Sequence, residues 1–149
     1  MGIVINQPLD LTVAEIFEHL QISTDTDFSE EPIMAGGPLP IDHGFVLHRN
    51  CEREWEASLK VTGEITLTTS RDILRAIAAS TGPREHLIAL GYAGWAAGQL
   101  EQELAENSWL TLPANSDIIF ATPYQRRLST AAAQLGVDMN LISGEAGHA

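Results

Sequence analysis

Residues 90–114 read LGYAGWAAGQLEQELAENSWLTLPA and predict a strand end, a glycine–aromatic turn, an amphipathic helix and a second strand, in that order. Glycines stand on either side of Tyr92 and Trp95. Glycine tolerates backbone conformations that other residues avoid, and large aromatic rings can cover such a bend. This stretch therefore predicts a tight turn at the end of a strand, followed by a change from strand to helix.

The helix predicted from Gly98 onward has one apolar face. The residues of that face recur at helical spacing: Ala97, Leu100 and Leu104. Asn107 tolerates the left-handed conformation that often ends a helix. Trp109 then begins a short alternating segment, which predicts a strand that Pro113 stops.

The composition indicates one acidic globular domain. The chain has 149 residues, 20 acidic and eight basic, and a formal net charge of −12. The basic residues are scattered, whereas nucleic-acid binding draws on clustered Lys and Arg. We therefore do not expect nucleic acid as a partner. No apolar run approaches the roughly 18 residues that a membrane helix needs, and the single cysteine, Cys51, fits a reducing, cytoplasmic compartment.

Short apolar segments predict seven strands besides the one at Trp109. They cover residues 2–6, 33–35, 44–48, 58–61, 65–69, 86–90 and 117–121. The fourth and fifth predict a hairpin around Gly63. Residues 23–32 are polar and acidic, which predicts a mobile surface loop.

Three further segments predict helices by their start signals. Thr12 is followed three residues later by Glu15, which predicts a capping box. Ser70 is expected to cap the second helix, with Asp72 in its first turn, and Thr122 to cap the last. Their expected inner faces are Val13, Ile16, Phe17 and Leu20; Ile73, Leu74, Ile77 and Ala78; and Leu128, Ala131, Ala132 and Leu135. Strands and helices do not alternate regularly, so we expect an α+β fold with a largely antiparallel sheet.

Several blocks together resemble the AlgH/YqgE family of bacterial proteins, over essentially the whole chain. The blocks are GIVINQP at 2–8, GGP at 36–38 with Asp42, GFVLH at 44–48, TTSRD at 68–72, LGYAGW at 90–95 with GQLE at 98–101 and WLT at 109–111, and AGHA at 146–149. The resemblance implies a strongly bent antiparallel sheet that forms a pseudo-barrel flanked by helices, in a cytoplasmic protein. The family is named after a transcriptional regulator of alginate synthesis, and the resemblance implies no defined reaction.

The resemblance also bears on domain organisation. Family members usually carry a further segment before the Gly-x-x-x-Asn motif, with a strand and often a Cys-Glu-His triplet. This chain begins at that motif, so we expect a single domain over residues 1–149 that lacks the segment. Cys51 lies outside the matching blocks and is not a substitute for the family cysteine.

The residues of these blocks suggest one ligand-binding surface. Ser70, Arg71 and Asp72 form a corner at a helix start, where backbone amides and a guanidinium can hold an anion. The alternative is structural: Ser70 as a cap, Asp72 as a partner of the helix dipole and Arg71 in an ion pair. The other expected members of the surface are Tyr92, Trp95, Gln99, Glu145 and His148, the last two from a tail that we expect to dock onto the body.

Other chemistry finds little support in the sequence. Asp42, His43 and His48 match no standard metal spacing, even with Cys51. No Gly-x-Ser-x-Gly elbow, Walker motif or dinucleotide motif is present. We therefore expect no cofactor, and a non-enzymatic regulator that acts through an unknown protein or small-molecule partner. The alternatives are a small-molecule or nucleotide-binding enzyme with its pocket at Ser70–Asp72 and, with less support, a direct DNA-binding regulator.

Overall fold

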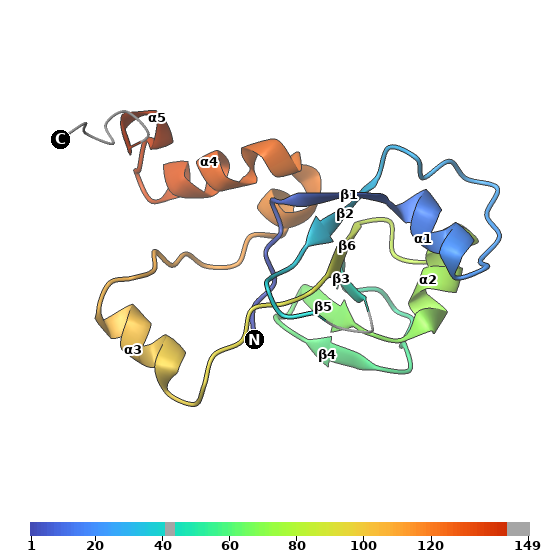
Figure 1. Ribbon diagram of the computed structural model, residues 1–149, viewed down its shortest axis with the longest axis horizontal. Coiled ribbons are helices and arrows are strands. Elements are labelled where there is room, and N and C mark those ends of the chain that lie inside the picture. Colours follow the sequence, from blue (N-terminus) through green and yellow to red (C-terminus); the bar gives the residue numbers. More distant parts are fainter. Residues whose placement is uncertain (41–43, 143–149) are drawn as a thin grey trace.

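The computed structural model describes residues 1–40 and 44–142, and it has an α+β architecture (Figure 1). In chain order its elements are β1 (Pro8–Thr12), α1 (Val13–His19), β2 (Pro32–Ala35), β3 (Phe45–Arg49), β4 (Ser58–Lys60), β5 (Ile65–Thr68), α2 (Arg71–Ala78), β6 (His86–Leu90), α3 (Gln99–Ala105), η1 (Asp117–Ala121), α4 (Tyr124–Gln134) and α5 (Met139–Ile142). The expected hairpin between β4 and β5 is present.

The six strands form one bent sheet in the order β1-β2-β6-β3-β5-β4. Every pairing is antiparallel except that of β2 with β6. The prediction of an α+β fold with a largely antiparallel sheet is thus confirmed. In the part of the chain that the structure describes, the sheet bends but does not close into a barrel, and β1 and β4 are its edges (Figure 1).

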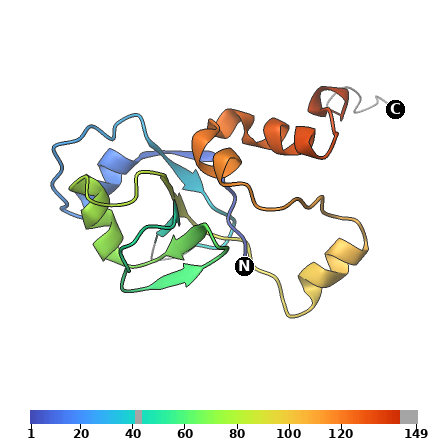
Figure 2. The same cartoon turned by 180° about the vertical axis from the view of Figure 1, so that it is seen from behind.

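Strand register divides the apolar side chains between the two faces of the sheet. Residues paired across neighbouring strands share a face. Val46 pairs with Ile88, and both belong to the larger core, which α1 and α2 cover. Leu47 pairs with Leu87, which lies with Met34 in a smaller cluster on the other face, under η1 and α4. Figure 2 shows these helices on opposite sides of the strands.

Helix α1 begins as predicted. The backbone N–H of Thr12 donates to Glu15 Oε2 at 2.8 Å, and Glu15 N–H donates back to the Thr12 hydroxyl at 3.3 Å. Its buried Phe17 meets Phe28 edge-to-face, with ring centroids 5.1 Å apart. Phe28 belongs to the predicted surface loop, so one side chain of that loop contributes to the core.

Two glycines allow the ends of β2 and β6 to approach each other. Gly91 has φ +79°, and a side chain there would stand 2.6 Å from the carbonyl oxygen of Gly37. A Cβ at Gly36 would collide with the backbone of Gly91. The glycine–aromatic turn predicted from residues 90–95 is therefore a close backbone crossing, which only glycine permits.

The strand predicted at residues 2–6 is wrong in position. Gly2 forms an isolated bridge with Ala93, and the regular strand is β1, which begins at Pro8. Proline lacks an N–H, but it is tolerated as the first residue of an edge strand. The regular strand therefore starts at Pro8, two residues after the end of the predicted one.

Two other predicted strands are absent. Residues 109–112 have no regular secondary structure, and residues 117–121 form a π-helical turn. The side-chain oxygen of Asn115 accepts hydrogen bonds from the N–H groups of Asp117 and Ile118, at 2.9 and 3.2 Å, which starts a turn instead of a strand. An alternating pattern gives a strand only where a neighbouring strand can pair with it.

Helix α4 is less buried than its pattern predicts. Of its expected inner residues only Ala132 is buried, and Leu128 keeps 54% of its surface exposed. The N-cap position is Pro123, one residue after the expected Thr122, whose hydroxyl donates to the carbonyl of Asp117 instead. No helix in the described residues is long and apolar enough to cross a membrane.

Candidate functional site

The structure divides the predicted site residues into two groups. Ser70, Arg71 and Asp72 lie at the start of α2, whereas Trp95 and Gln99 lie beside α3 at the opposite end of the molecule (Figure 1). These described residues therefore do not form the single shared surface that we expected. Tyr92 stays with the sheet, edge-to-face with Phe45 at 6.0 Å. Glu145 and His148, together with the expected docking of the tail, lie outside the described residues.

The corner at the start of α2 holds a neighbouring loop. The Ser70 hydroxyl donates to Asp72 Oδ1 at 2.5 Å and accepts from the N–H of Ala57 at 3.1 Å. Asp72 Oδ2 accepts from the N–H of Glu56 at 3.0 Å. The Ser70 side chain makes no cap hydrogen bond to the helix, so the expected cap instead anchors the chain before β4.

The ionisation state of Asp72 fits this anchoring role. Burial acts to raise the pKa of its carboxyl, but the hydrogen bonds from Ser70 and from the amides of Glu56 and Ile73 outweigh it and lower the pKa. The carboxylate stays ionised, with its oxygens already engaged. Arg71 is exposed, and the expected ion pair of Arg71 is not among those found in the described residues.

The loop anchored in this way covers a hollow of about 420 Å³ at the β4 edge. Strand register places His48, Thr66 and Lys60 in one row across its floor. His48 Nδ1 lies 2.9 Å from the carbonyl oxygen of Arg49, so Nδ1 carries the proton and Nε2 accepts from Thr68, 3.0 Å away. The Thr68 oxygen in turn accepts from the hydroxyl of Ser58 at 2.8 Å.

The hydrogen-bonded chain of His48, Thr68 and Ser58 fits a structural role better than a role in acid–base catalysis. Burial lowers the pKa of His48, and no carboxylate among the described residues pairs with it to stabilise an imidazolium. A proton passed inward from Ser58 would create a buried, uncompensated charge. Both ring nitrogens are engaged, so His48 is not free to bind a metal, and no metal-binding group of three is found in residues 1–40 and 44–142. Asp42 and His43 lie outside the described residues.

The second group belongs to a segment that we call the aromatic arm, residues 95–114. The indole N–H groups of Trp95 and Trp109 donate to the same oxygen of Glu103, at 3.0 and 2.7 Å. Gln99 donates to the other oxygen at 2.9 Å. The two indole rings meet at 5.9 Å with an interplanar angle of 70°. Sequence reasoning identified Trp95 and Gln99 but missed Glu103, whose signal was its position one helical turn after Gln99.

Glu103 remains charged in this arrangement. The hydrogen bonds from Trp109, Gln99 and Trp95, in that order, lower the pKa of its carboxyl. The side chains around it are open to solvent: Trp109 is 48% exposed and Leu110 70% exposed. Helix α3 has no buried residue: of its predicted inner face, Leu100 is half-buried and Leu104 is exposed, so this face does not join the core. Both views show α3 standing away from the sheet (Figures 1 and 2).

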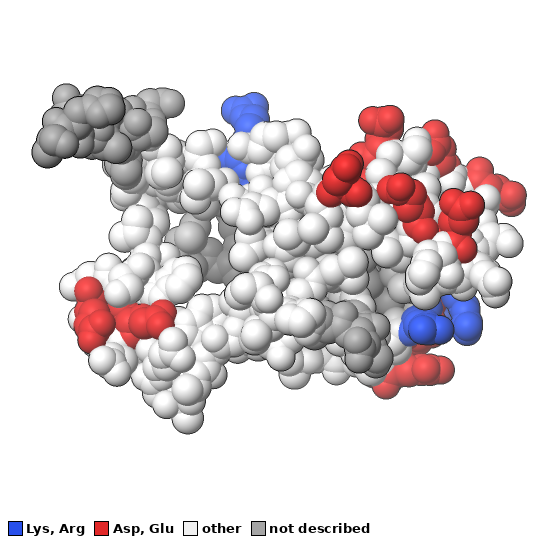
Figure 3. All heavy atoms as spheres, viewed as in Figure 1, with Lys and Arg blue, Asp and Glu red and all other residues white. Residues whose placement is uncertain are grey.

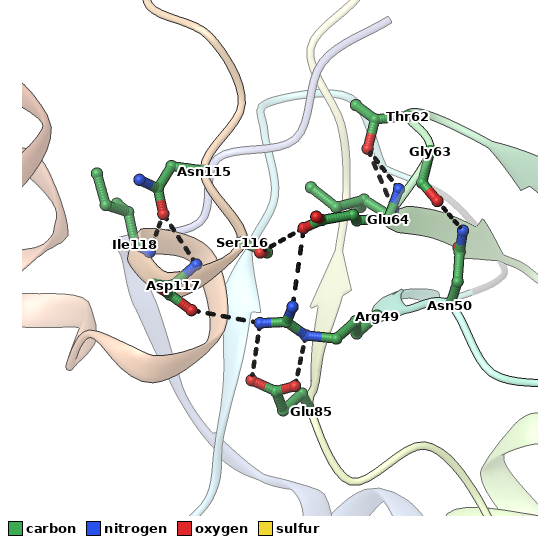
Figure 4. Close-up of polar contacts among 11 residues, drawn as sticks. Arg49, Asn50, Thr62, Gly63, Glu64, Glu85, Asn115, Ser116, Asp117 and Ile118 are labelled. Atoms are coloured by element: carbon green, nitrogen blue, oxygen red, sulfur yellow. Dashed lines mark hydrogen bonds and ion pairs between the residues drawn. The ribbon is translucent and has the colours of Figure 1, made fainter.

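The end of the linker that follows the arm is fixed to the sheet by one arginine, as Figure 4 shows. Arg49 Nε lies 2.5 Å from Glu85 Oε2, NH2 lies 3.3 Å from Asp117 Oδ1, and NH1 lies 3.7 Å from Glu64 Oε2. Ser116 donates to Glu64 at 2.8 Å. One guanidinium thus joins β3, the β4–β5 turn, the start of β6 and η1. No local sequence signal predicted this cluster, because its members come from four separate segments.

Comparison with known proteins agrees with this architecture. The model of the family described as AlgH-like (DUF179) matches residues 1–140. The chain belongs to the AlgH-like family. The predicted resemblance is therefore confirmed.

Relatives from several bacteria match the AlgH-like chain over its whole length. A UPF0301 protein of Thioalkalivibrio sulfidiphilus is 55% identical over 149 residues, which are 100% of this chain and 80% of the relative. One from Saccharophagus degradans is 51% identical, with 100% and 73% covered.

Solved structures support the same fold. The solution structure of AlgH from Pseudomonas aeruginosa is 48% identical, with a TM-score of 0.76 over 100% of this chain and 79% of that one. The crystal structure of protein DIP2367 from Corynebacterium diphtheriae has a TM-score of 0.64 at 13% identity, over 87% and 69% of the two chains, and shares the fold alone.

Proposed function

We propose that this AlgH-like chain is a non-enzymatic regulatory protein of the bacterial cytoplasm that binds a protein partner through its aromatic arm. The observation that carries the proposal is that the aromatic arm has a defined conformation although its helix does not pack against the core. The arm is held by hydrogen bonds to Glu103, yet α3 buries no side chain and leaves Trp109 and Leu110 exposed. Aromatic side chains on such exposed surfaces are the usual anchors of protein interfaces.

The charge of the arm indicates the chemistry of the partner. Glu101, Glu103 and Glu106 give it three negative charges, and no Lys or Arg occurs anywhere in residues 85–125. Acidic atoms are visible over α3 in Figure 3, with no basic atom beside them. Complementary charge steers association and selects partners. The partner we propose is a segment with Arg or Lys flanked by apolar residues, whose cations meet Glu103 and the indole faces.

A second copy of this chain is a poorer occupant. A twofold dimer brings the same patch of both subunits together. Two arms would then place six glutamates in one interface, and like charges oppose such contact. Self-association is therefore an outcome that the test must detect.

The test uses a synthetic helical peptide that has Arg residues on one face and Leu residues on the other. When the protein is titrated with this peptide, its tryptophan fluorescence is expected to report binding. A control peptide in which Glu replaces each Arg is expected not to bind. Glu103→Gln should weaken binding about tenfold, in the range of an interface anchor. The matched control Glu54→Gln removes the same charge far from the arm and should leave the affinity unchanged. Equal binding of both peptides, or light scattering that reports a dimer lost in Glu103→Gln, would refute the basic-partner proposal.

The other candidate functions have less support. A ligand pocket at Ser70–Asp72 would have to displace hydrogen bonds that anchor the chain at Glu56 and Ala57. Direct DNA binding would need clustered cations, but Arg49 is surrounded by carboxylates and Arg127 is engaged with backbone carbonyls. Charge repulsion between a chain of net charge −12 and phosphate adds to this argument.

A further inference from the structure

A second hollow, of about 230 Å³, lies between the sheet and the start of α4. Its lining includes Glu31, His86, Tyr124 and Arg127, which are its titratable groups, together with Thr122 and Pro123. It is smaller than the roughly 300–1,000 Å³ of pockets that hold drug-sized ligands. Its size suits a small ion or the charged end of a larger molecule.

Arg127 is the unusual member of this lining. Its Nε donates to the carbonyl of Thr122 at 3.1 Å, and its NH1 donates to the carbonyl of Ile5. The ion pairs found in the described residues involve Arg49 and His86, so Arg127 has no carboxylate partner there. Burial lowers the pKa of its guanidinium, which reflects the cost of enclosing a charge without an anion.

The start of α4 adds a second set of donors. The first amides of a helix have no partner within the helix. The N-cap residue is Pro123, and no side chain caps this end. Pro123 and Tyr124 both line the hollow, so the positive end of an 11-residue helix faces the same space as Arg127.

The carboxylate in the lining is already paired. Glu31 Oε1 lies 2.7 Å from His86 Nε2. Burial acts to lower the pKa of His86, but the hydrogen bond and charge of Glu31 outweigh it and raise the pKa. Below that raised value the pair carries no net charge, and Arg127 sets the charge of the hollow. Above it, His86 is neutral and Glu31 repels an anion.

We propose that this hollow is a binding site for a small oxyanion, a phosphate or carboxylate group, held by Arg127 and the first amides of α4. The site is independent of the aromatic arm and of any partner bound there. Inorganic phosphate and acetate are the probes, because they distinguish a phosphate ligand from a carboxylate ligand.

The test is thermal unfolding at pH 6 with phosphate, acetate or chloride at equal ionic strength. Stabilisation follows the ratio of ligand concentration to dissociation constant. At ten times that constant the midpoint should rise about 4 °C with phosphate, acetate or both, and not with chloride. The rise should shrink at pH 9. Amide NMR signals of Tyr124 and Gln125 should move with the same ligand.

Matched variants identify the site. Arg127→Gln should abolish the rise, whereas Arg126→Gln removes the same charge from the exposed neighbouring position and should keep it. If Arg127→Gln does not fold, Arg127→Lys keeps the charge without the planar fork and should bind more weakly. A wild-type midpoint that phosphate and acetate raise no more than chloride, or an undiminished rise in the Arg127 variant, would overturn the proposal.

Discussion

The indole N–H of Trp109 donates a 2.7 Å hydrogen bond to the carboxylate of Glu103, six residues earlier in the chain. Trp95, which precedes α3 in the chain, donates to the same oxygen. A hydrogen bond to an ionised carboxylate is stronger than one between neutral groups. The conformation of the aromatic arm therefore depends on one charge more than on packing, since α3 buries no side chain.

Glu103→Gln should loosen the arm without unfolding the body. Amide hydrogen exchange in α3 is expected to accelerate, because Gln retains an acceptor but not the charge. The unfolding midpoint should stay where it is, since the core lies elsewhere. Glu101→Gln, on the same helix, is the control and should leave exchange unchanged. Unchanged exchange in Glu103→Gln would show that the arm is held by something else.

The pH dependence of the arm should follow the same carboxylate. Because the folded-state pKa of Glu103 is lowered, its contribution is present above the ordinary Glu pKa of about 4.3 and is lost as pH falls through the lower folded value. Fluorescence of the exposed tryptophan is expected to change below pH 4 and to lose that transition in Glu103→Gln. A transition that persists in the variant would assign it to another group.

The pair of His86 and Glu31 should give the opposite pH dependence, with a contribution to stability that is lost as pH rises. The pKa of His86 is raised in the folded protein, so its contribution is complete below the ordinary His value of about 6.5 and is lost as pH rises through the folded value. Urea unfolding at pH 6 and pH 9 should show a larger loss for the wild type than for Glu31→Gln. Identical losses would mean that the 2.7 Å contact does not hold in solution.

Core packing gives the largest expected effect. Phe17 is 1% exposed and lies edge-to-face with Phe28. Phe17→Ala should lower the free energy of unfolding by about 3–5 kcal/mol, measured by urea denaturation. Leu128→Ala is the contrasting control: the sequence pattern places Leu128 inward, but it is 54% exposed, and its loss should stay within about 0.5 kcal/mol. Similar losses at the two positions would contradict the burial described for α4.

Arg49→Met should release η1 from the sheet. The change leaves Glu64, Glu85 and Asp117 facing one another without their shared cation. Faster hydrogen exchange is expected in residues 115–121, and more so at low salt, where repulsion is less screened. Arg53→Met, which removes a cation from its place over Trp55, should not affect these amides. Exchange that stays slow would show that Asn115 and Thr122 alone hold the turn.

Local signals predicted the elements that depend on local chemistry. The capping box of Thr12 and Glu15 and the hairpin around Gly63 need only neighbouring residues, and both are present. The strands expected at 2–6, 109–112 and 117–121 depended on partners that the sequence pattern does not specify. β1 begins at Pro8, six residues after the predicted start at residue 2, because β2 pairs there. Asn115 redirects the last of these segments into a helical turn.

The candidate site was only partly predictable for the same reason. Trp95 and Gln99 stood out within one stretch, and their joint partner Glu103 lies in that stretch too. The Ser70 corner was expected beside them only because both groups belong to family motifs. That two motifs belong to one family does not mean that they lie close together in space. Here the bent sheet separates the two groups (Figure 1).

The most direct test of the partner-binding proposal is an NMR titration of the three tryptophan indole N–H signals with the basic peptide. The signals of Trp95 and Trp109 should move together, because both donate to Glu103, while that of Trp55, 7% exposed in the core, should stay in place and serve as the internal reference. Movement of the Trp55 signal alone, or of none of the three at saturating peptide, would contradict a docking role for the arm.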